Sequence, residues 1–242
     1  MVSSTPKPPT SARAKRVPRP SQAALFVDDN EDPVVLMARE LQGLVAGLDE
    51  AGRGPLAGPV VAGCVVLPHP LPAPLLALND SKALTKDARE LLFPLIQEHA
   101  LAWGVGVIEP ERIDEINILR ASLEAMAVAL QQCELMLQQP LKGALLDGNQ
   151  KAPLPLHITQ RTLVGGDAKS RPSMAAAVLA KVVRDRRMLL EHARFPRYGF
   201  NTHMGYGTPQ HLAALKLYGA SVVHRRSFAP VSAALQAGPR DG

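Results

Sequence analysis

The chain has few of the residues that build disulfide-rich or zinc-binding proteins. Its 242 residues include only two cysteines, Cys64 and Cys133, which lie far apart and have no CxxC spacing. This pattern argues against a zinc site or a disulfide framework and suits a reducing compartment. No apolar run reaches the roughly 18–20 residues of a membrane span, and residues 1–20 lack the apolar stretch of a secretory signal. We therefore expect a soluble, cytoplasmic protein with no membrane partner.

Acidic residues are missing from most of the C-terminal part of the chain. No Asp or Glu lies between Glu191 and Asp241, and this interval contains six basic residues and six of the nine aromatic residues. A positive surface with aromatic side chains is typical of proteins that bind a phosphate backbone. Chance clustering on a solvated face explains the pattern equally well. The composition therefore permits a nucleic-acid partner but does not establish one.

Residues 1–43 are predicted to form an arm outside the folded body. The first 20 residues contain five bases and no acid, and residues 28–32 then add four acids. Such a polar segment buries too little apolar surface to offset its chain entropy, so we expect the arm to be largely disordered. The apolar piece VVLMAREL, residues 34–41, can form a helical turn or more before the body begins at residue 44.

Residues 44–242 are predicted to form a single α/β domain. Short apolar or β-branched runs predict strands at about 44–49, 59–67, 101–109, 143–147 and 157–165. Helical patterns follow at about 110–117, 118–138, 173–193 and 209–219. The last helix starts with Thr208 as its cap and a proline in its first turn. Strands first and βα alternation afterwards indicate a mixed sheet flanked by helices.

Carboxylates follow three of the predicted strands. Asp49 and Glu50 end the first strand, Asp147 ends the fourth, and Asp167 follows the fifth. Ligands gather where the strands of an open α/β sheet end, so these acids can converge. Four clustered carboxylates repel one another, and divalent cations such as magnesium, which prefers oxygen ligands, remove that repulsion. A single Asp is more often a solvated turn or helix cap, but such a role is less expected for acids that end apolar strands.

Seven segments between residues 47 and 228 carry a series of motifs. They are GLDEAGRGPLAGPVV (47–61), NDSKAL (79–84), INILRASLEAM (116–126), LLDGN (145–149), AAAVLAKVVRD (175–185), YGFNTHMGYGTPQH (198–211) and HRRSF (224–228). In sequence and in order, they resemble the motifs of the type 2 ribonuclease H family. One short motif would be weak evidence, whereas seven in order over about three quarters of the chain are strong evidence.

The resemblance implies a ribonuclease H-like fold: a five-stranded mixed sheet flanked by helices, with a helical C-terminal extension. It also implies that two divalent ions, Mg²⁺ or Mn²⁺, are bound by four catalytic acids: Asp49, Glu50, Asp147 and Asp167. Asp185 is a weaker candidate for the fourth place. It lies inside a predicted helix after Lys181 and Arg184, where a local salt bridge is its expected role.

Two further motifs resemble the family's ribose-binding elements. Gly52, Arg53 and Gly54 match the GRG segment, which lies against the ribose and phosphate at the cleavage junction. Glycine lets the backbone approach a ligand, although a tight turn between two strands explains the same residues. Tyr206 matches the tyrosine that stacks near the reactive ribonucleotide. The alternative, a core tyrosine, is disfavoured by the glycines on both sides of it.

Other matched residues resemble contacts to the substrate backbone. Ser81 and Lys82 belong to this group, as does Arg225 or its neighbour Arg226, with a purely structural role as the alternative. The chain departs from the family at Met204, where a lysine is usual. We expect this change to remove one phosphate contact and to affect affinity without altering the reaction.

The implied activity is endonucleolytic cleavage of the RNA strand of RNA–DNA hybrids and incision at single ribonucleotides in duplex DNA. Recognition would use phosphates and 2′-hydroxyls, and two ions would activate water and stabilise the leaving oxygen, giving 5′-phosphate and 3′-hydroxyl ends. Another two-metal nuclease on this fold and a non-catalytic hybrid-binding protein are alternatives. The GRG segment and Tyr206 argue against the first, and four acids that repel phosphate argue against the second. Because no feature indicates an oligomer, we expect a monomer.

Overall fold

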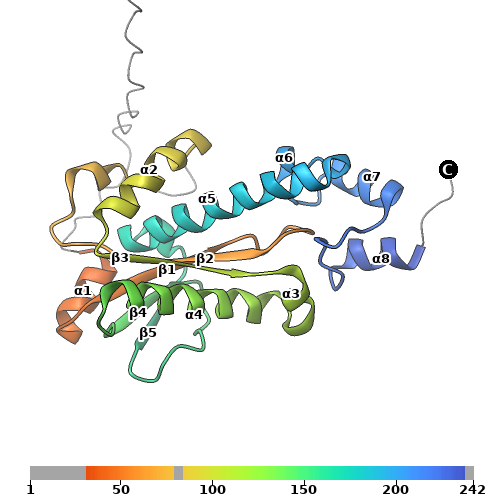
Figure 1. The fold of residues 1–242 in the computed structure, drawn as a ribbon. Helices are drawn as coiled ribbons and strands as arrows, with labels where there is room; N and C mark the ends of the chain where they lie inside the picture. Colours follow the sequence, from red (N-terminus) through yellow and green to blue (C-terminus); the bar gives the residue numbers. More distant parts are fainter. Residues whose placement is uncertain (1–30, 79–83, 238–242) are drawn as a thin grey trace, which may run out of the picture.

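Five strands form one mixed sheet at the centre of the computed structural model, which describes residues 31–78 and 84–237. The strands are β1 (Val45–Ala51), β2 (Val60–Val66), β3 (Ala102–Ile108), β4 (Gly143–Asp147) and β5 (Thr159–Leu163), in the order β3–β2–β1–β4–β5 (Figure 1). The first three strands pair antiparallel, whereas β4 runs parallel to both β1 and β5. This arrangement confirms the predicted fold class.

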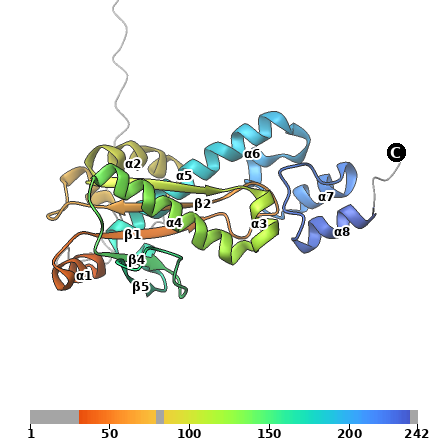
Figure 2. The ribbon, with the colours of Figure 1, turned by 60° about the horizontal axis from the view of Figure 1, so that its bottom comes forward.

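Helices cover both faces of the sheet. On one face lie α3 (Pro110–Ile116) and α4 (Ile118–Leu137), and on the other lie α2 (Lys86–His99) and α5 (Arg171–Arg194) (Figures 1 and 2). The start of α5 packs very closely on β1, because a Cβ atom on Gly47 would lie only 2.4 Å from the backbone nitrogen of Ser173. Only glycine permits this approach, which brings the start of α5 close to the strand that carries Asp49 and Glu50.

The packed body begins earlier than residue 44, the boundary expected from composition. Helix α1 (Pro33–Leu41) buries Val34 and Met37 in a cluster with Val45 of β1 and Leu145 of β4. Asp32 is buried and accepts hydrogen bonds from the Ser170 hydroxyl at 3.0 Å and from the backbone N–H of Arg171 at 2.7 Å. Apolar residues of α1 recur at helical spacing and so can bury one face. Residues 1–30 lie outside the described residues, and disorder of that segment remains a prediction.

Short helices form a C-terminal extension at one end of the molecule (Figures 1 and 2). They are the 3₁₀ turn η3 (Pro196–Tyr198), α6 (Phe200–His203), α7 (Pro209–Tyr218) and α8 (Ala229–Ala237). The extension is joined to the loop between β1 and β2 by an isolated bridge between Ala57 and His224. None of the described helices is both long and apolar enough to cross a membrane.

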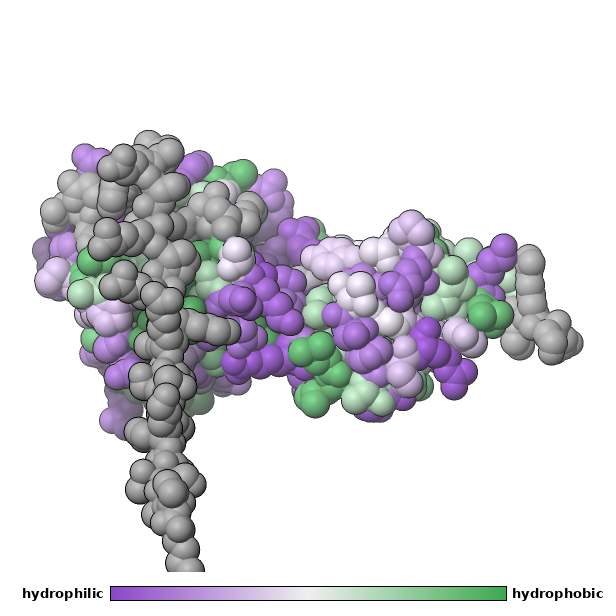
Figure 3. All heavy atoms as spheres, turned by 90° about the horizontal axis from the view of Figure 1, so that it is seen from above, coloured by the Kyte–Doolittle hydropathy of each residue, from purple (hydrophilic) through white to green (hydrophobic). Residues whose placement is uncertain are grey.

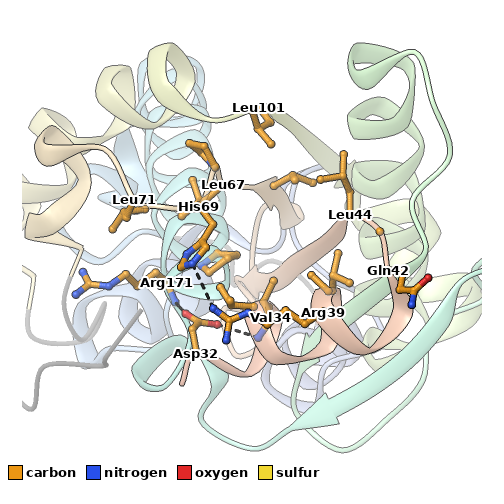
Figure 4. Close-up of a pocket in the computed structure, with 17 residues that line it drawn as sticks. Asp32, Val34, Arg39, Gln42, Leu44, Leu67, His69, Leu71, Leu101 and Arg171 are labelled. Carbon is orange, nitrogen blue, oxygen red and sulfur yellow. Dashed lines mark hydrogen bonds between the residues drawn. The ribbon is translucent and has the colours of Figure 1, made fainter. Parts of the chain in front are cut away.

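A pocket of about 580 Å³ lies at the opposite end of the sheet from the extension. Its walls include α1, the start of β1 at Val45 and the end of β2 at Val66 (Figure 4). Polar groups lie at one side, where Arg39 Nη2 is 3.5 Å from His69 Nε2. Because a strand rises about 3.3 Å per residue, most of the length of β1 separates this pocket from the carboxyl end of that strand.

Candidate active site

The parallel pairing of β1 with β4 brings three of the predicted acids to one edge of the sheet. In the register of this pair Leu48 lies beside Leu146, so Asp49 and Asp147 are the next residues of neighbouring strands. Glu50 follows Asp49 within β1. Asp49 is buried and its carboxylate accepts the backbone N–H of Glu50 at 2.7 Å. The register therefore brings Asp49, Glu50 and Asp147 to the same edge of the sheet, as expected from their positions at the ends of strands.

The fourth acid, Asp167, reaches the same place from a different element. It lies in the 3₁₀ turn η2 (Gly166–Ala168), directly before α5, and its side chain is buried. The N–H of Gly166 donates a 2.8 Å hydrogen bond to Oδ1 of Asp147, which ties this turn to the end of β4. That bond holds Asp167 beside the other carboxylates.

The electrostatics of the site follow from the burial of like charges. The pKa of Asp49 is raised well above its usual value, first by burial and then by the charges of Glu50, Asp147 and Asp167. Burial also raises the pKa of Glu50, and the neighbouring Arg53 guanidinium opposes this shift. Burial and like charge both disfavour ionised carboxylates unless a cation compensates them.

The side chains suit a divalent ion that keeps part of its water shell. Across residues 31–78 and 84–237, no three His, Cys, Asp or Glu side chains are arranged to enclose a metal ion. Magnesium does not need such a cage, because it commonly binds through one or two carboxylates, several waters and substrate phosphate. The donors here are all oxygens. A Cβ atom on Gly166 would lie 3.5 Å from Asp147 Oδ1 and 3.7 Å from Ser173 Oγ, a buried hydroxyl with no hydrogen-bond partner among the described residues.

The GRG segment and Tyr206 lie against each other next to these acids. Gly52 follows β1 directly, and the Arg53 guanidinium lies 3.3 Å from the carboxylate of Glu50. A Cβ atom on Gly54 would be 3.6 Å from the ring of Tyr206, whose side chain is 45% exposed. The two loops are joined because the N–H of Leu56 donates to the carbonyl of Gly205 at 2.8 Å. The GRG segment and the exposed ring thus form one surface at the end of β1.

Comparison with known proteins identifies the family of the chain that carries this site. The model of the family described as Ribonuclease HII matches residues 46–231. The Ribonuclease HII of Dechloromonas aromatica (strain RCB) is 50% identical over 190 residues, which are 78% of this chain and 93% of that protein. The chain belongs to the ribonuclease HII family. Membership confirms the predicted resemblance and makes the chain a nuclease, a hydrolase of phosphodiester bonds.

Solved structures agree with the fold. The ribonuclease H2 of Pyrococcus horikoshii OT3 matches with a TM-score of 0.66 at 28% identity, covering 80% of this chain and 98% of that one. A structure of Bst-RNase HIII in complex with Mn²⁺ matches with a TM-score of 0.65 over 86% of this chain and 75% of that one. At 17% identity the second likeness concerns the fold alone. The ribonuclease H-like fold is thereby confirmed.

The structure places Arg225 differently from the surface contact expected of it. Its side chain is fully buried, and its guanidinium donates to the carbonyls of Gly52, Arg53, Gly58 and Pro59. Because the whole side chain is enclosed by protein, it does not meet a substrate backbone directly. Arg226, the alternative, is exposed. Ser81 and Lys82 lie outside the described residues, so their contacts stay predictions.

Met204, where the resemblance predicts a lysine, packs its side chain against the apolar cluster of the extension that contains Met188 and Phe200. Its backbone carbonyl accepts a hydrogen bond from Arg184 at 3.0 Å. Together with Lys181 and Tyr206 it lines a groove of about 480 Å³. The expected loss of a phosphate contact remains a prediction.

The basic surface of the C-terminal part is smaller than the sequence suggests. Hydrophilic side chains gather midway along the face that carries α2 and α5 (Figure 3). Within the segment that follows Glu191, Arg194 is paired with that glutamate and Arg225 is buried. Arg197, Lys216 and Arg226 are exposed and form no ion pair with the described residues. A phosphate backbone would therefore meet a few separate cations along the extension.

A chain of histidines supports the loop that carries Tyr206. The N–H of Ser221 donates to Nδ1 of His224 at 3.0 Å, so this nitrogen accepts and the proton of the neutral ring is on Nε2. That Nε2 lies 3.0 Å from Nε2 of His211, whose Nδ1 lies 2.9 Å from the carbonyl of Tyr206. Only neutral rings complete this sequence of donors and acceptors. The network could not be identified from the sequence, because its members become neighbours only in the fold.

We predict that the histidine network makes the fold sensitive to acid. Burial, with a smaller contribution from His211, lowers the pKa of His224 from 6.5 to about 4. Between those values the unfolded chain binds a proton that the folded chain does not, so stability falls as pH drops from 6.5 and levels off below 4. The full shift corresponds to roughly 3 kcal/mol. Thermal melts from pH 7 to 4 measure it.

Two substitutions isolate the contribution of His224. His224→Asn should lower stability at pH 7 but flatten its decline on acidification, because the titrating ring is gone. His157→Gln removes an imidazole that is 54% exposed and should keep the wild-type slope. An equally steep decline in His224→Asn would show that other groups cause the acid sensitivity.

Proposed function

We propose that the chain cleaves the RNA strand of RNA–DNA hybrids and incises duplex DNA at single embedded ribonucleotides, leaving 5′-phosphate and 3′-hydroxyl ends. The observation that carries the proposal is the convergence of Asp49, Glu50, Asp147 and Asp167 beside a GRG segment and an exposed tyrosine. We further propose that it acts as a monomer in the cytoplasm. Both cysteines are free and buried, in keeping with a reducing compartment.

The four acids are the residues that would hold divalent ions, Mg²⁺ or Mn²⁺. When bound, two such ions would supply an activated water and stabilise the departing 3′ oxygen. The chain contributes a set of oxygen donors in which Asp49 and Asp167 are buried, and the bond from Gly166 to Asp147 keeps one carboxylate oriented. The Mn²⁺ complex of the related Bst-RNase HIII supports the use of a divalent ion on this fold.

The chain also has groups that can distinguish ribose from deoxyribose. A 2′-hydroxyl both donates and accepts hydrogen bonds, so backbone groups of the GRG segment can recognise it. The Tyr206 ring lies next to Gly54 and is open to solvent, so it can stack on the sugar or base at the junction. A nuclease that cut DNA and RNA alike would not need this pair.

We predict that Asp147→Asn abolishes cleavage and leaves binding of a hybrid unchanged or slightly tighter. The change keeps the shape of the side chain but removes the charge that would hold an ion, and it reduces the repulsion of phosphate. Cleavage at saturating Mg²⁺ and affinity for the hybrid are measured separately. Activity above roughly a tenth of wild type would contradict the assignment, since the loss of a metal-binding group should exceed about 1.4 kcal/mol.

Asp185→Asn is the matched control for this experiment. Asp185 accepts a hydrogen bond from Lys181 at 2.7 Å on the same helix. It follows Ser173 by 12 residues of α5, roughly 18 Å along the helix axis. Its substitution should leave cleavage within a few-fold of wild type. Loss of activity equal to that of Asp147→Asn would mean that the fourth acid has been misassigned.

We predict that Tyr206→Ala lowers kcat/KM on a single embedded ribonucleotide by roughly 10- to 100-fold, the effect of losing a stack worth about 1–3 kcal/mol. A long hybrid should lose less, because neighbouring ribonucleotides offer other productive registers. Tyr218→Ala removes another ring that is 45% exposed, on α7, and should affect neither substrate. Equal losses on both substrates in Tyr206→Ala would assign this tyrosine a structural role.

A further inference from the structure

Two buried arginines bind the loop between β1 and β2 on its interior side. The side chains of Arg184 and Arg225 are 1% and 0% exposed, and neither forms an ion pair with a carboxylate among the described residues. Arg184 donates to the carbonyls of Ala57 and Pro59 at 3.2 and 3.0 Å. Arg225 donates four hydrogen bonds of 2.6 to 3.1 Å, all to carbonyls of residues 52–59. Burying two guanidinium groups is unfavourable, so the loop carbonyls must compensate them.

The bonds from Arg225 determine which way the GRG peptide groups face. In a trans peptide the carbonyl of one residue and the N–H of the next point in opposite directions. The Arg225 guanidinium donates to the carbonyls of Gly52 and Arg53, so the N–H groups of Arg53 and Gly54 face away from the protein interior. Neither N–H has a hydrogen-bond partner among the described residues. Two successive free N–H groups can donate hydrogen bonds to a hydroxyl or phosphate oxygen.

Arg184 links the same loop to the one that carries Tyr206. Its Nη1 donates to the carbonyl of Met204 at 3.0 Å, and its Cζ lies 5.9 Å from the centre of the Tyr206 ring. Gly52 has a φ of +98°, and a Cβ atom there would lie 2.0 Å from Nε of Arg184. The arginines therefore contact both the loop of the GRG segment and the loop that carries Tyr206, which together form the surface that would meet the ribose.

We propose that Arg225, with Arg184, is a specificity-determining positioning residue: it holds the Gly52 and Arg53 carbonyls inward so that the Arg53 and Gly54 N–H groups face the substrate ribose. This inference rests on the proposed function and goes beyond it, because neither arginine touches substrate. The divergent nitrogens of a guanidinium reach four carbonyls at once. A lysine ammonium, with three donors on one atom, does not span them.

The test measures discrimination between ribose and deoxyribose by binding. Two DNA duplexes of the same sequence are used, one with a single ribonucleotide, and their Kd values are compared in Ca²⁺, which tolerates looser coordination than magnesium and should support little cleavage. Arg225→Lys should reduce the preference for the ribonucleotide duplex by roughly 10-fold, the effect of misplacing a hydrogen-bonding group. Its affinity for the all-DNA duplex should change by less than about 3-fold, because phosphate contacts remain.

Arg226→Ala is the control, since Arg226 is the exposed neighbour of Arg225. It should weaken both duplexes alike and leave their ratio unchanged. A purely structural role for Arg225 would lower the affinity for both duplexes together, in proportion to the folded fraction seen in a thermal melt. An unchanged ratio in Arg225→Lys overturns the inference, whereas a wild type that shows no preference and no cleavage overturns the proposed function itself.

Hydrogen exchange provides a second readout in case Arg225→Lys is poorly folded. Arg184→Lys leaves the bonds to the GRG carbonyls in place but disturbs those to Ala57 and Pro59. It should speed exchange of the Leu56 and Gly58 N–H groups, which donate to Gly205 and Val223, and leave α4 protected as in wild type. Uniformly faster exchange, or the loss of cooperative melting in both lysine variants, would overturn the inference by showing that the arginines serve the fold in general.

Discussion

The parallel pairing of β1 with β4 is the contact on which the site depends. It joins strands that are far apart in the sequence, and its register sets Asp49 beside the position of Asp147. The start of α5 then packs on Gly47 of β1, and the turn before that helix carries Asp167. A slip of one residue in this pairing would turn every side chain of the strand to the other face. The geometry of the acids is therefore a consequence of sheet register.

Most of the buried charge in the site is not neutralised by a side chain of the opposite sign. At one edge, burial and then the charges of Glu50, Asp147 and Asp167 raise the pKa of Asp49 and make its ionised state costly without a cation. Beneath the adjacent loop, two guanidiniums are compensated by carbonyl dipoles, and burial lowers the pKa of Arg225 to about 9. The acids need cations, and the loop next to the arginines presents N–H groups. Both features suit a substrate that is itself an anion.

Most of the sheet could be predicted from the sequence because its strands are short, apolar and bounded by turns. The same logic predicts that the acids lie together, since a carboxylate at the end of a buried apolar strand is costly to place there unless it binds a ligand or an ion. Their role in binding metal ions stays a prediction. Helix α2 was not predicted, and it contains Pro94 in its interior, which normally argues against a helix. Packed structure begins before residue 44, the boundary expected from composition. The segment before it is held by hydrogen bonds that Asp32 accepts from Ser170 and Arg171, and these residues are too distant in sequence for a local pattern to reveal the contact.

The two adjacent arginines mark the limit of prediction from sequence patterns. An arginine in a basic, aromatic segment is expected to meet phosphate, and Arg226 is exposed as that expectation requires. Its neighbour Arg225 points inward because the loop between β1 and β2 offers four carbonyls. Which of the two is buried depends on a loop more than 160 residues away in the chain, so composition and spacing leave the choice open.

The most direct measurement is incubation of the full chain with Mg²⁺ and a DNA duplex that contains one ribonucleotide, beside an all-DNA duplex of the same sequence. We expect a single cut at the ribonucleotide, with 5′-phosphate and 3′-hydroxyl ends, and an intact control. Cleavage of the control at comparable rates would contradict ribose recognition by the GRG segment and Tyr206. An uncut ribonucleotide duplex, with a long hybrid still cleaved, would contradict the proposed action at single ribonucleotides.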